Sequence, residues 1–458
     1  MTSKPAIPAA TPAREAAFAV LYRVEAAGAF VSALLFRTLA RSSLSDADRA
    51  LTTTVVLGVL RHRARLDHAL AALLSRPLDT LPAAIRTVLR MGAFEVLELD
   101  RVPAPAAVSE AVALARRHGH AGTAALVNAV LRRLAAEGPV PPPEAGSDPI
   151  GHLSVVHSHP GWLVTRWVAR WGMEEAQALL AANARPAPTT LRVNTLRTTR
   201  DELMGLLRAR GLDADPGIVP EAVRVHGSLI GRLPLYEQGL CAPQDEGAML
   251  VVHALADAAV SGSTVVDACA APGGKSLHLA ALMANRGRVL AVDVHPGKVQ
   301  ALARRAASFG ATCVEVHNLD AAEIGRRWPG AADAVLVDAP CSGLGTVRRR
   351  PEIKWRIDEQ WLVRSAQKQQ AILRGAAGAV RPGGTLVYSV CSNEPEEGPE
   401  AIGGFLSAHP SFAFAPFAGT FPQVVGGHPV DGVEAGEAHL LPHRHGTDGF
   451  YIARLRRL

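Results

Sequence analysis

Two cysteines and an aspartate stand where predicted strands end. The predicted strand over 333–339 runs into DAPCSG, which holds Asp338 and Cys341, and the one over 384–390 runs into SVCSNE, which holds Cys391. The carboxyl ends of parallel strands share one edge of a sheet, and such folds bind their ligands there. We therefore expect both thiols and the carboxylate to line one site.

These residue types suit one reaction on a pyrimidine base. C5 of cytosine is too weak a nucleophile to attack a methylsulfonium, but a thiolate that adds to C6 makes C5 carbanion-like. A carboxylic acid near N3 stabilises the adduct, a base later removes the C5 proton, and a second thiol can assist adduct breakdown. The set predicts methylation of cytosine C5 with S-adenosylmethionine (SAM) as donor. The spacing alone does not rank Cys341 and Cys391 as nucleophile.

A turn rich in small residues follows the predicted strand 263–268. Its sequence, VVDACAAPGGKS, lets the backbone approach a ligand at a helix N-terminus. The spacing matches neither the GxGxxG of dinucleotide enzymes nor a GxxxxGK[ST] phosphate loop. Asp293 ends the second strand and Asp320 follows the third, where carboxylates can hold a ribose and border an adenine. We predict an adenosine ligand, although both carboxylates could instead be helix caps.

A basic stretch follows the motif that holds Asp338 and Cys341. Basic side chains beside an aromatic ring can grip phosphates and stack a base. The alternative is a solvated basic loop. We expect five residues of this stretch to bind RNA, namely Arg348, Arg349, Arg350, Lys354 and Trp355.

Alternating strands and helices must position these residues. Strand-like segments alternate with helical stretches from about residue 245, which indicates a parallel, doubly wound sheet. The strand-like segments are 263–268, 287–294, 312–318, 333–339 and 384–390.

The whole chain is too long for one core. Residues 13–137 have helical periodicity and predict an all-α domain of five to seven helices, with Ser45 as the cap of one of them. The other expected parts are a disordered lead-in over 1–12, an interdomain linker over 138–150, a small α/β module over 151–240 and the sheet domain over 241–458.

Composition narrows the class of protein. Residues 1–137 hold 17 Lys and Arg against 11 Asp and Glu, whereas the rest holds 31 of each, so the whole net charge of +6 lies in the helical part. This surplus suits a polyanion such as nucleic acid or, equally well, a solvated arginine-rich surface. No apolar run is long enough to span a bilayer, and the N-terminus lacks the pattern of a signal peptide, so we expect a cytoplasmic protein.

The cysteines are odd in number and form no CxxC pair, which argues against a disulfide framework or a zinc site. We therefore expect no metal. An isolated cysteine is most often a core residue, and we give this interpretation to Cys241, Cys269 and Cys313.

Several motifs resemble those of the RNA 5-methylcytosine methyltransferases: DACAAPGGKS, AVDV, VLVDAPCSGLGTVRRRPEIKW and VYSVCS. The helical residues 13–137 are similar to the antitermination factor NusB, an RNA-binding fold. LRVNTLRTTRDEL resembles the small module that the RsmB/Sun family of 16S ribosomal RNA methyltransferases carries between such domains, and HGTDGFYIARL resembles its closing strand. The resemblance covers nearly the whole chain. It implies a Rossmann-like SAM-dependent methyltransferase domain behind a NusB-like domain, with 16S ribosomal RNA as partner.

The resemblance also implies roles. Asp293 would hold the ribose of SAM, Asp320 its adenine side, and Asp338 the target base or the methionine end. Cys391 would be the nucleophile and Cys341 would aid product release, with Lys275 as a further catalytic residue. The turn that would line SAM is Cys269, Ala270, Ala271, Pro272, Gly273, Gly274 and Lys275.

Departures and alternatives accompany the resemblance. The family usually has Thr before the nucleophile and an Asn after two glutamates, where this chain has Val390 and Gly398-Pro399. Neither change removes a group that the reaction needs. DNA cytosine enzymes use the fourth-strand Pro-Cys, but their ENV tripeptide is absent here. Transfer RNA as substrate and a non-catalytic RNA-binding assembly factor stay open.

Overall fold

The computed structural model describes residues 10–226, 234–419 and 421–458, which divide into two compact units. The helical unit is the chain up to Arg185 together with Val347–Arg356, and the sheet unit is Pro186–Thr346 with Ile357–Leu458. The expected linker over 138–150 does not separate units, because both its flanks lie in the helical unit. Its carbonyls are held there: Pro141 O accepts a hydrogen bond from His68 (2.9 Å) and Pro143 O from His152 (2.8 Å). The expected lead-in lies mostly outside the described residues.

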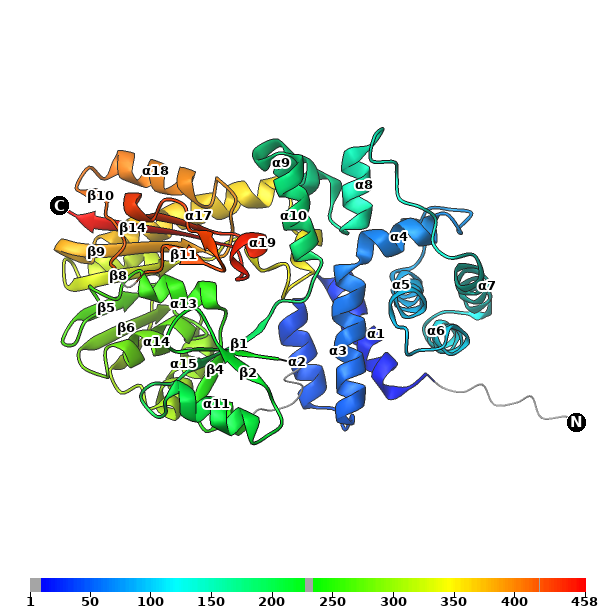
Figure 1. Cartoon of the computed structure of the whole chain (residues 1–458), viewed down its shortest axis with the longest axis horizontal. Coiled ribbons are helices and arrows are strands. Elements are labelled where there is room, and N and C mark those ends of the chain that lie inside the picture. Colours follow the sequence, from blue (N-terminus) through cyan, green and yellow to red (C-terminus); the bar gives the residue numbers. More distant parts are fainter. Residues whose placement is uncertain (1–9, 227–233, 420) are drawn as a thin grey trace, which may run out of the picture. The chain divides into compact units, whose positions relative to one another are not determined.

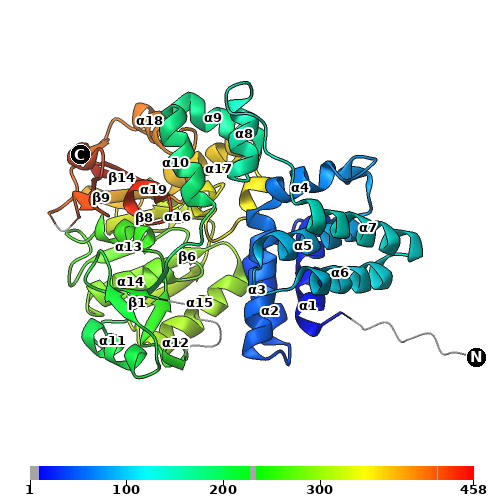
Figure 2. The same cartoon turned by 45° about the vertical axis from the view of Figure 1, so that its right-hand side comes forward.

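Helices build the first unit, and α5, α6 and α7 lie together in it (Figure 2). Seven α-helices fall within 12–137, as the periodicity predicts. Ser45 caps α3 as expected, with its Oγ accepting from Asp48 N at 3.2 Å. The apolar stripes pack into one core that includes Phe18, Leu66 and Val88. The helices are α1 Pro12–Ala27, α2 Val31–Ala40, α3 Asp46–Arg61, α4 Arg63–Ala71, η1 Leu78–Thr80, α5 Ala83–Glu98, α6 Ala104–His118, α7 Ala121–Glu137, α8 Pro149–Val156, α9 Gly161–Trp171 and α10 Met173–Asn183.

A short segment from much later in the chain completes the helical unit. We call Val347–Arg356 the strap; it contains the single turn η4 (Ile353–Trp355). Trp355 Nε1 donates to Leu60 O at 2.7 Å, and Lys354 Nζ donates to Arg61 O at 3.0 Å. These bonds satisfy carbonyls at the C-terminus of α3, which have no partner within the helix.

The sheet unit contains an eight-stranded sheet, which confirms the predicted doubly wound architecture (Figure 1). The strand order is β10-β14-β9-β8-β5-β6-β7, with β13 paired to β14; β9, β8, β5, β6 and β7 are parallel, and β14 is antiparallel to β9. Its strands are β5 Thr264–Asp267, β6 Arg288–Asp293, β7 Val314–Asn318, β8 Ala332–Asp338, β9 Val380–Val390, β10 Phe412–Phe414, β13 Glu437–Leu440 and β14 Phe450–Arg457. A separate pair joins β11 Val424–Val425 to β12 His428–Pro429.

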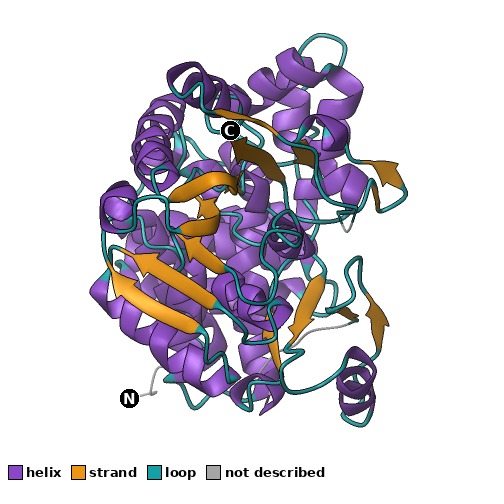
Figure 3. Cartoon of the chain, turned by 90° about the vertical axis from the view of Figure 1, so that its left-hand side faces the viewer, coloured by secondary structure: helices purple, strands orange, loops and turns teal. Residues whose placement is uncertain are grey.

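Helices cover both faces of this sheet (Figure 3). Neighbouring strand residues face opposite cores, so Val265 packs with α13, α14 and α15, whereas Val266 packs with α17 and α18. Burial on both faces explains why the inner parallel strands β5, β6 and β8 are largely apolar, whereas the edge strand β7 has the sequence VEVHN and is only partly buried. The helices are α13 Glu246–His253, α14 Gly274–Leu282, α15 Pro296–Phe309, η2 Ala321–Glu323, α16 Ile324–Arg327, η3 Leu344–Thr346, α17 Glu359–Ala377, α18 Pro399–Ala408, η5 Val433–Ala435 and α19 Pro442–His445.

A small antiparallel sheet precedes the large one in the same unit. Its strand order is β2-β3-β1-β4. Thr199 and Glu202 form the capping box of α11, the amphipathic helix expected after TLRVN. The elements are β1 Thr189–Val193, α11 Arg200–Arg208, β2 Ala214–Pro216, β3 Ala222–Val225, α12 Pro234–Glu237 and β4 Cys241–Pro243. Among the described residues of the whole chain, no helix has the length and apolar character needed to cross a bilayer.

Candidate active site at the carboxyl edge of the sheet

The order of the strands places the predicted site residues together. The chain runs from β5 outward to β6 and β7, then returns to the other side of β5 with β8. Open α/β sheets bind their ligands outside the carboxyl ends of the strands, at the point where the strand order reverses. Asp338 ends β8 in register with Ser389 of β9, and Ser389 Oγ donates to Asp338 Oδ1 at 2.9 Å.

The two strand-end thiols meet just beyond these residues. Cys341 Sγ and Cys391 Sγ are 3.4 Å apart, and both side chains are partly exposed. Gly345 N donates to Cys391 O at 3.0 Å, which ties the two strand-end loops together. The pKa of Cys341 is raised well above its ordinary value by its hydrogen bond to Cys391, together with burial and the nearby Glu397 carboxyl. The two sulfur atoms are thus within hydrogen-bond distance, and either thiol can be the donor.

Lys275 contributes a cation to the same edge. Its Nζ lies 2.6 Å from Asp338 Oδ2 and 5.7 Å from the centre of the Phe450 ring. Burial alone would lower the pKa of Lys275, but Asp338, Cys391 and Asp267 together raise it. The side chain thus stays charged and favours an anion at Cys391.

The predicted cofactor turn connects β5 to α14. Gly273 caps α14 with φ +104°, and a Cβ there would lie 2.2 Å from Leu302 Cδ1, so both the backbone conformation and the space demand glycine. Asp267, at the end of β5, accepts from Ser276 Oγ at 2.6 Å. Burial raises the pKa of Asp267 to about 6, and the Asp338 carboxylate adds to this shift.

Several carboxylates surround this turn. Burial raises the pKa of Cys269, and the charges of Asp267, Asp338 and Asp293 raise it further. Cys269 is therefore a protonated thiol, in keeping with the interpretation of it as a packed residue. Carboxyl groups thus stand at three neighbouring strand ends, and of these Asp338 is paired with Lys275. Carboxyl groups beside a ligand site suit the positive sulfonium and ammonium groups of SAM.

Asp293 and Asp320 occupy the strand ends that the sequence suggests. Asp293 Oδ1 accepts from His295 N at 2.9 Å and Asp320 Oδ1 from Ala322 N at 2.9 Å. Each carboxylate therefore makes a local turn or cap hydrogen bond, as the alternative interpretation holds. A bond through one oxygen is compatible with ligand binding through the other, so the cofactor role stays a prediction.

Two residues that sequence reasoning left without a role support the thiol loops. Glu397 is fully buried and accepts from Ser342 N (2.7 Å) and Ser342 Oγ (2.6 Å), which fixes the residue after Cys341. Burial raises the pKa of Glu397. Ser389 holds Asp338, as described above. The signal for Ser389 was available, because it stands two residues before Cys391 on the strand predicted over 384–390.

The basic stretch does not lie in this unit. All five residues belong to the strap, which is part of the helical unit. Lys354 is fully buried on the Arg61 carbonyl and Trp355 donates to Leu60 O, so Lys354 has no free ammonium for a phosphate. Burial and the Arg61 charge lower the pKa of Lys354. We therefore withdraw Lys354 from the expected RNA contacts. Arg350 is exposed, whereas Arg348 and Arg349 are partly buried.

One group of side chains in the described residues could share a metal ion. Glu221, His253 and His278 are buried in the sheet unit, and Glu221 Oε1 lies 2.7 Å from His253 Nε2 and 2.5 Å from His278 Nε2. Although burial alone would raise it, the two histidines lower the pKa of Glu221. Burial lowers the pKa of His278 to about 4. The carboxylate thus lies close to both imidazole rings, and we interpret the group as a link between α13, α14 and the residue that precedes β3.

Comparisons with known proteins cover the same regions. Residues 254–456 match the family 16S rRNA methyltransferase RsmB/F, residues 11–136 the NusB family, and residues 159–229 the RsmF/B-like ferredoxin-like domain. A Bacillus subtilis protein described as a probable ribosomal RNA small subunit methyltransferase B is 37% identical over 98% of this chain and 99% of its own length.

Two solved structures are similar to the fold. The crystal structure of PH0851 has a TM-score of 0.80, with 25% identity over 98% of this chain and 99% of that one. The structure of NSun6 from Pyrococcus horikoshii with SFG has a TM-score of 0.58 and 22% identity, and it covers 66% of this chain and 99% of its own. The second likeness concerns the fold alone.

Proposed function

Because the chain belongs to the RsmB/F family of SAM-dependent 16S rRNA methyltransferases, we propose that it methylates C5 of a cytosine in 16S ribosomal RNA through a covalent Cys391 adduct. One observation carries this proposal: two thiols 3.4 Å apart lie beside the Lys275–Asp338 ion pair at the carboxyl edge of the sheet. A pair of partly exposed thiols with a nearby ammonium suits nucleophilic addition to an electron-poor ring.

Electrostatics support Cys391 as the nucleophile. The thiolate is the reactive form of cysteine, and a nearby cation favours it. Cys391 is one of the groups that raise the pKa of Lys275, and the pKa of Cys341 is itself raised by its hydrogen bond to Cys391 and by burial. These surroundings support Cys391 as the nucleophile in the proposal, where spacing alone could not rank the two cysteines.

The proposed steps follow from these groups. The Cys391 thiolate forms a bond to C6, and the electron pair of the C5–C6 double bond moves toward C5 and the N3 side of the ring. The Lys275–Asp338 pair holds a proton with which it stabilises N3. After methylation, a base removes the C5 proton, the double bond re-forms and the C6–S bond breaks. Cys341 donates its hydrogen bond to the departing Cys391 thiolate and so assists product release.

SAM fits the residues of the cofactor turn. The turn Cys269–Lys275 and Asp293 would hold it, because a glycine-opened helix start meets three carboxylates there. When bound, SAM supplies the electrophilic methyl group for C5. Asp320 is included as the proposed neighbour of the adenine.

Single substitutions of cysteine test the assignment of Cys391 as the nucleophile. Cys391→Ala should abolish transfer of labelled methyl from SAM to 16S rRNA, whereas Cys341→Ala should accumulate a protein–RNA adduct that withstands denaturing electrophoresis. Cys313→Ala, a buried cysteine of the sheet core, is the matched control and should retain activity. Full activity of Cys391→Ala would refute the nucleophile assignment.

The substrate requires its own test. Unmodified 16S rRNA and total transfer RNA should be offered to the full chain in parallel, and bisulfite sequencing should locate the product. Methylation of a single 16S cytosine is the expected result. Methylation of transfer RNA alone would overturn the substrate, and SAM binding without methylation of either RNA would favour an assembly factor.

A further inference from the structure

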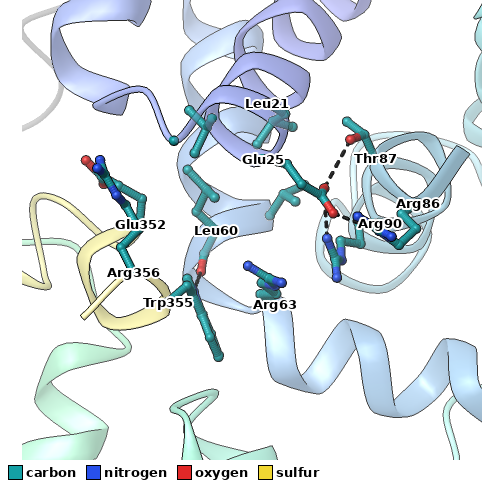
Figure 4. A pocket seen from close by; sticks show the side chains of 13 residues that line it. Leu21, Glu25, Leu60, Arg63, Arg86, Thr87, Arg90, Glu352, Trp355 and Arg356 are labelled. Atoms are coloured by element: carbon teal, nitrogen blue, oxygen red, sulfur yellow. Dashed lines mark hydrogen bonds and ion pairs between the residues drawn. The ribbon is translucent and has the colours of Figure 1, made fainter. Parts of the chain in front are cut away.

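A cavity of about 330 Å³ lies within the helical unit. Its walls come from α1, the end of α3, the start of α4, α5 and the strap (Figure 4). Four arginines and two glutamates line it, with Trp355 and several leucine and valine side chains. This volume is at the small end of ligand pockets and suits a single nucleotide unit. The charged residues are Glu25, Arg63, Arg86, Arg90, Glu352 and Arg356.

On one side of the cavity, carboxylates of the protein neutralise the arginine side chains. Glu25 accepts from Arg86 Nε (2.8 Å), Arg90 Nη1 (2.9 Å) and Thr87 Oγ1 (3.3 Å), as Figure 4 shows. Arg90 also forms a two-bond pair with Asp67, at 2.6 and 2.9 Å. These guanidinium groups are neutralised and hydrogen-bonded by the protein itself, so they form a rigid wall.

The other side has cations with few protein acceptors. Arg63 lies over the Trp355 ring at 5.3 Å from its centre, and its nearest carboxylate contact, to Asp67, is a long 3.7 Å. Burial and the neighbouring Arg90 lower the pKa of Arg63. Arg356 stacks on Phe30 at 4.2 Å, and its Nη1 is buried with no hydrogen-bond partner among the described residues. Arg63 thus pairs with Asp67 only at long range, and Arg356, in the field of Glu352, keeps one guanidinium nitrogen without a hydrogen-bond partner among the described residues.

The remaining groups complete the recognition set. Glu352 Oε1 accepts from Val31 N at 3.2 Å, whereas Glu352 Oε2 is buried with no partner in the described chain. The Trp355 ring is fixed in orientation by its bond to Leu60 O. Guanidinium forks match phosphate oxygens, an aromatic face matches a base, and a carboxyl oxygen can accept from a ribose hydroxyl or a base amine.

We propose that this cavity binds a phosphate-bearing nucleotide unit of the RNA substrate, with Arg63 and Arg356 on the phosphate and Trp355 and Glu352 on the nucleoside. The proposal rests on the proposed function in that it takes RNA as the ligand. A free nucleotide carries the same chemistry, so the test separates the two sources. The proposal gives the strap a part in RNA binding that differs from the one its basic sequence predicts. The strap forms a wall of the cavity, and its buried lysine does not contact the ligand.

The test uses the full chain, 16S rRNA transcribed in vitro and uridine 5′-monophosphate. Arg63→Gln and Arg356→Gln should each weaken RNA affinity roughly 3–10-fold at ~0.15 M salt and reduce the slope of log affinity against log salt by about 1. Arg133→Gln removes the same charge from an exposed pair with Glu137 outside the cavity and should change affinity less than about twofold. Arg63→Lys, which keeps the charge, should restore part of the affinity and shows that the loss is not one of folding.

The outcomes separate the proposals. At saturating RNA the kcat of Arg63→Gln should stay unchanged while its KM rises, whereas failure of the proposed chemistry would appear in kcat of the Cys391 variant. Uridine monophosphate should compete with RNA for the wild-type chain and lose binding in Arg63→Gln. Equal RNA affinity of the cavity variants and Arg133→Gln would overturn the proposal. If Arg63→Gln loses binding of the free nucleotide but keeps the wild-type affinity for RNA, the ligand of the cavity is a free nucleotide and not a unit of the RNA.

Discussion

At the carboxyl edge of the sheet, Asp338, Cys341 and Cys391 come from two adjacent parallel strands, and each follows a strand end by at most three residues. The cavity of the helical unit takes its side chains from four helices and a strap that is more than 250 residues away from α3 in sequence. The first site is positioned by strand register, which a local pattern determines. The second is positioned by tertiary packing alone.

The charges of the two sites also differ. At the sheet edge Lys275 and Asp338 neutralise each other at 2.6 Å, and the proposed reactive groups are thiols whose protonation the ion pair can adjust. In the cavity, Arg63 reaches Asp67 only at 3.7 Å, and Arg356 keeps a buried guanidinium nitrogen without a hydrogen-bond partner among the described residues. A balanced cluster suits proton and electron movement within a bound substrate, whereas an unbalanced cluster suits binding of a charged ligand. Variants at the sheet edge should therefore change kcat, whereas variants in the cavity should change the affinity for RNA.

The largest effect is expected at Asp338. Asp338→Asn removes the carboxylate that pairs with Lys275 and that would act at N3, so kcat should fall by roughly 10²–10⁴-fold with KM for RNA within about threefold. Single-turnover methyl transfer at saturating RNA measures this. Asp333→Asn is the control on the same strand, since Asp333 accepts from Thr264 N and Arg381 away from the thiols. A kcat for Asp338→Asn within tenfold of wild type would remove Asp338 from the chemistry.

This contrast explains what the sequence could predict. The inner parallel strands were recognisable because burial on both faces makes them largely apolar, and Asp338, Cys341 and Cys391 then followed from the strand ends. The requirement for glycine at position 273 was indicated by the two adjacent glycines of the turn, Gly273 and Gly274. Glu397 was not predictable, because its hydrogen bonds to Ser342 cross 55 residues of chain. Lys354 was misinterpreted, since no local pattern reveals that its ammonium binds a carbonyl 293 residues away.

The next largest effect concerns that buried lysine. Lys354→Ala should destabilise the helical unit by about 2–4 kcal/mol, because it leaves a cavity and an unsatisfied Arg61 carbonyl. The salt slope of RNA binding should not change. Arg350→Ala, an exposed neighbour, should instead leave stability unchanged and reduce the slope. Urea unfolding and fluorescence anisotropy measure the two quantities. A slope lowered as much by Lys354→Ala as by Arg350→Ala would contradict the burial argument.

A pH effect distinguishes the sheet edge from the cavity. Asp267 has a folded pKa of about 6, above its ordinary 3.8, so the folded state holds the proton more tightly between these values. The contribution of this proton to the free energy of unfolding is complete below pH ~4. It is lost as the pH rises through ~6, and the total loss is ~3 kcal/mol. Asp267→Asn keeps an acceptor for Ser276 and should abolish this part of the pH dependence. Denaturant unfolding of the SAM-free chain at pH 4.5 and 7 gives the difference, and parallel curves for both proteins would contradict it.

The smallest effect tests whether strand register alone positions the carboxylate. Ser389→Ala removes the 2.9 Å hydrogen bond to Asp338 Oδ1 but leaves the 2.6 Å pair with Lys275. A single hydrogen bond is worth about 1 kcal/mol, so kcat should fall roughly 5–10-fold with KM unchanged. Ser389→Thr keeps the hydroxyl on a β-branched side chain that strands accept, and it should recover most of the rate. A rate loss in Ser389→Thr equal to that in Ser389→Ala would mean that packing at this buried position, rather than the hydroxyl, matters for Asp338. In that case the sheet edge would depend on tertiary packing in the same way as the cavity does.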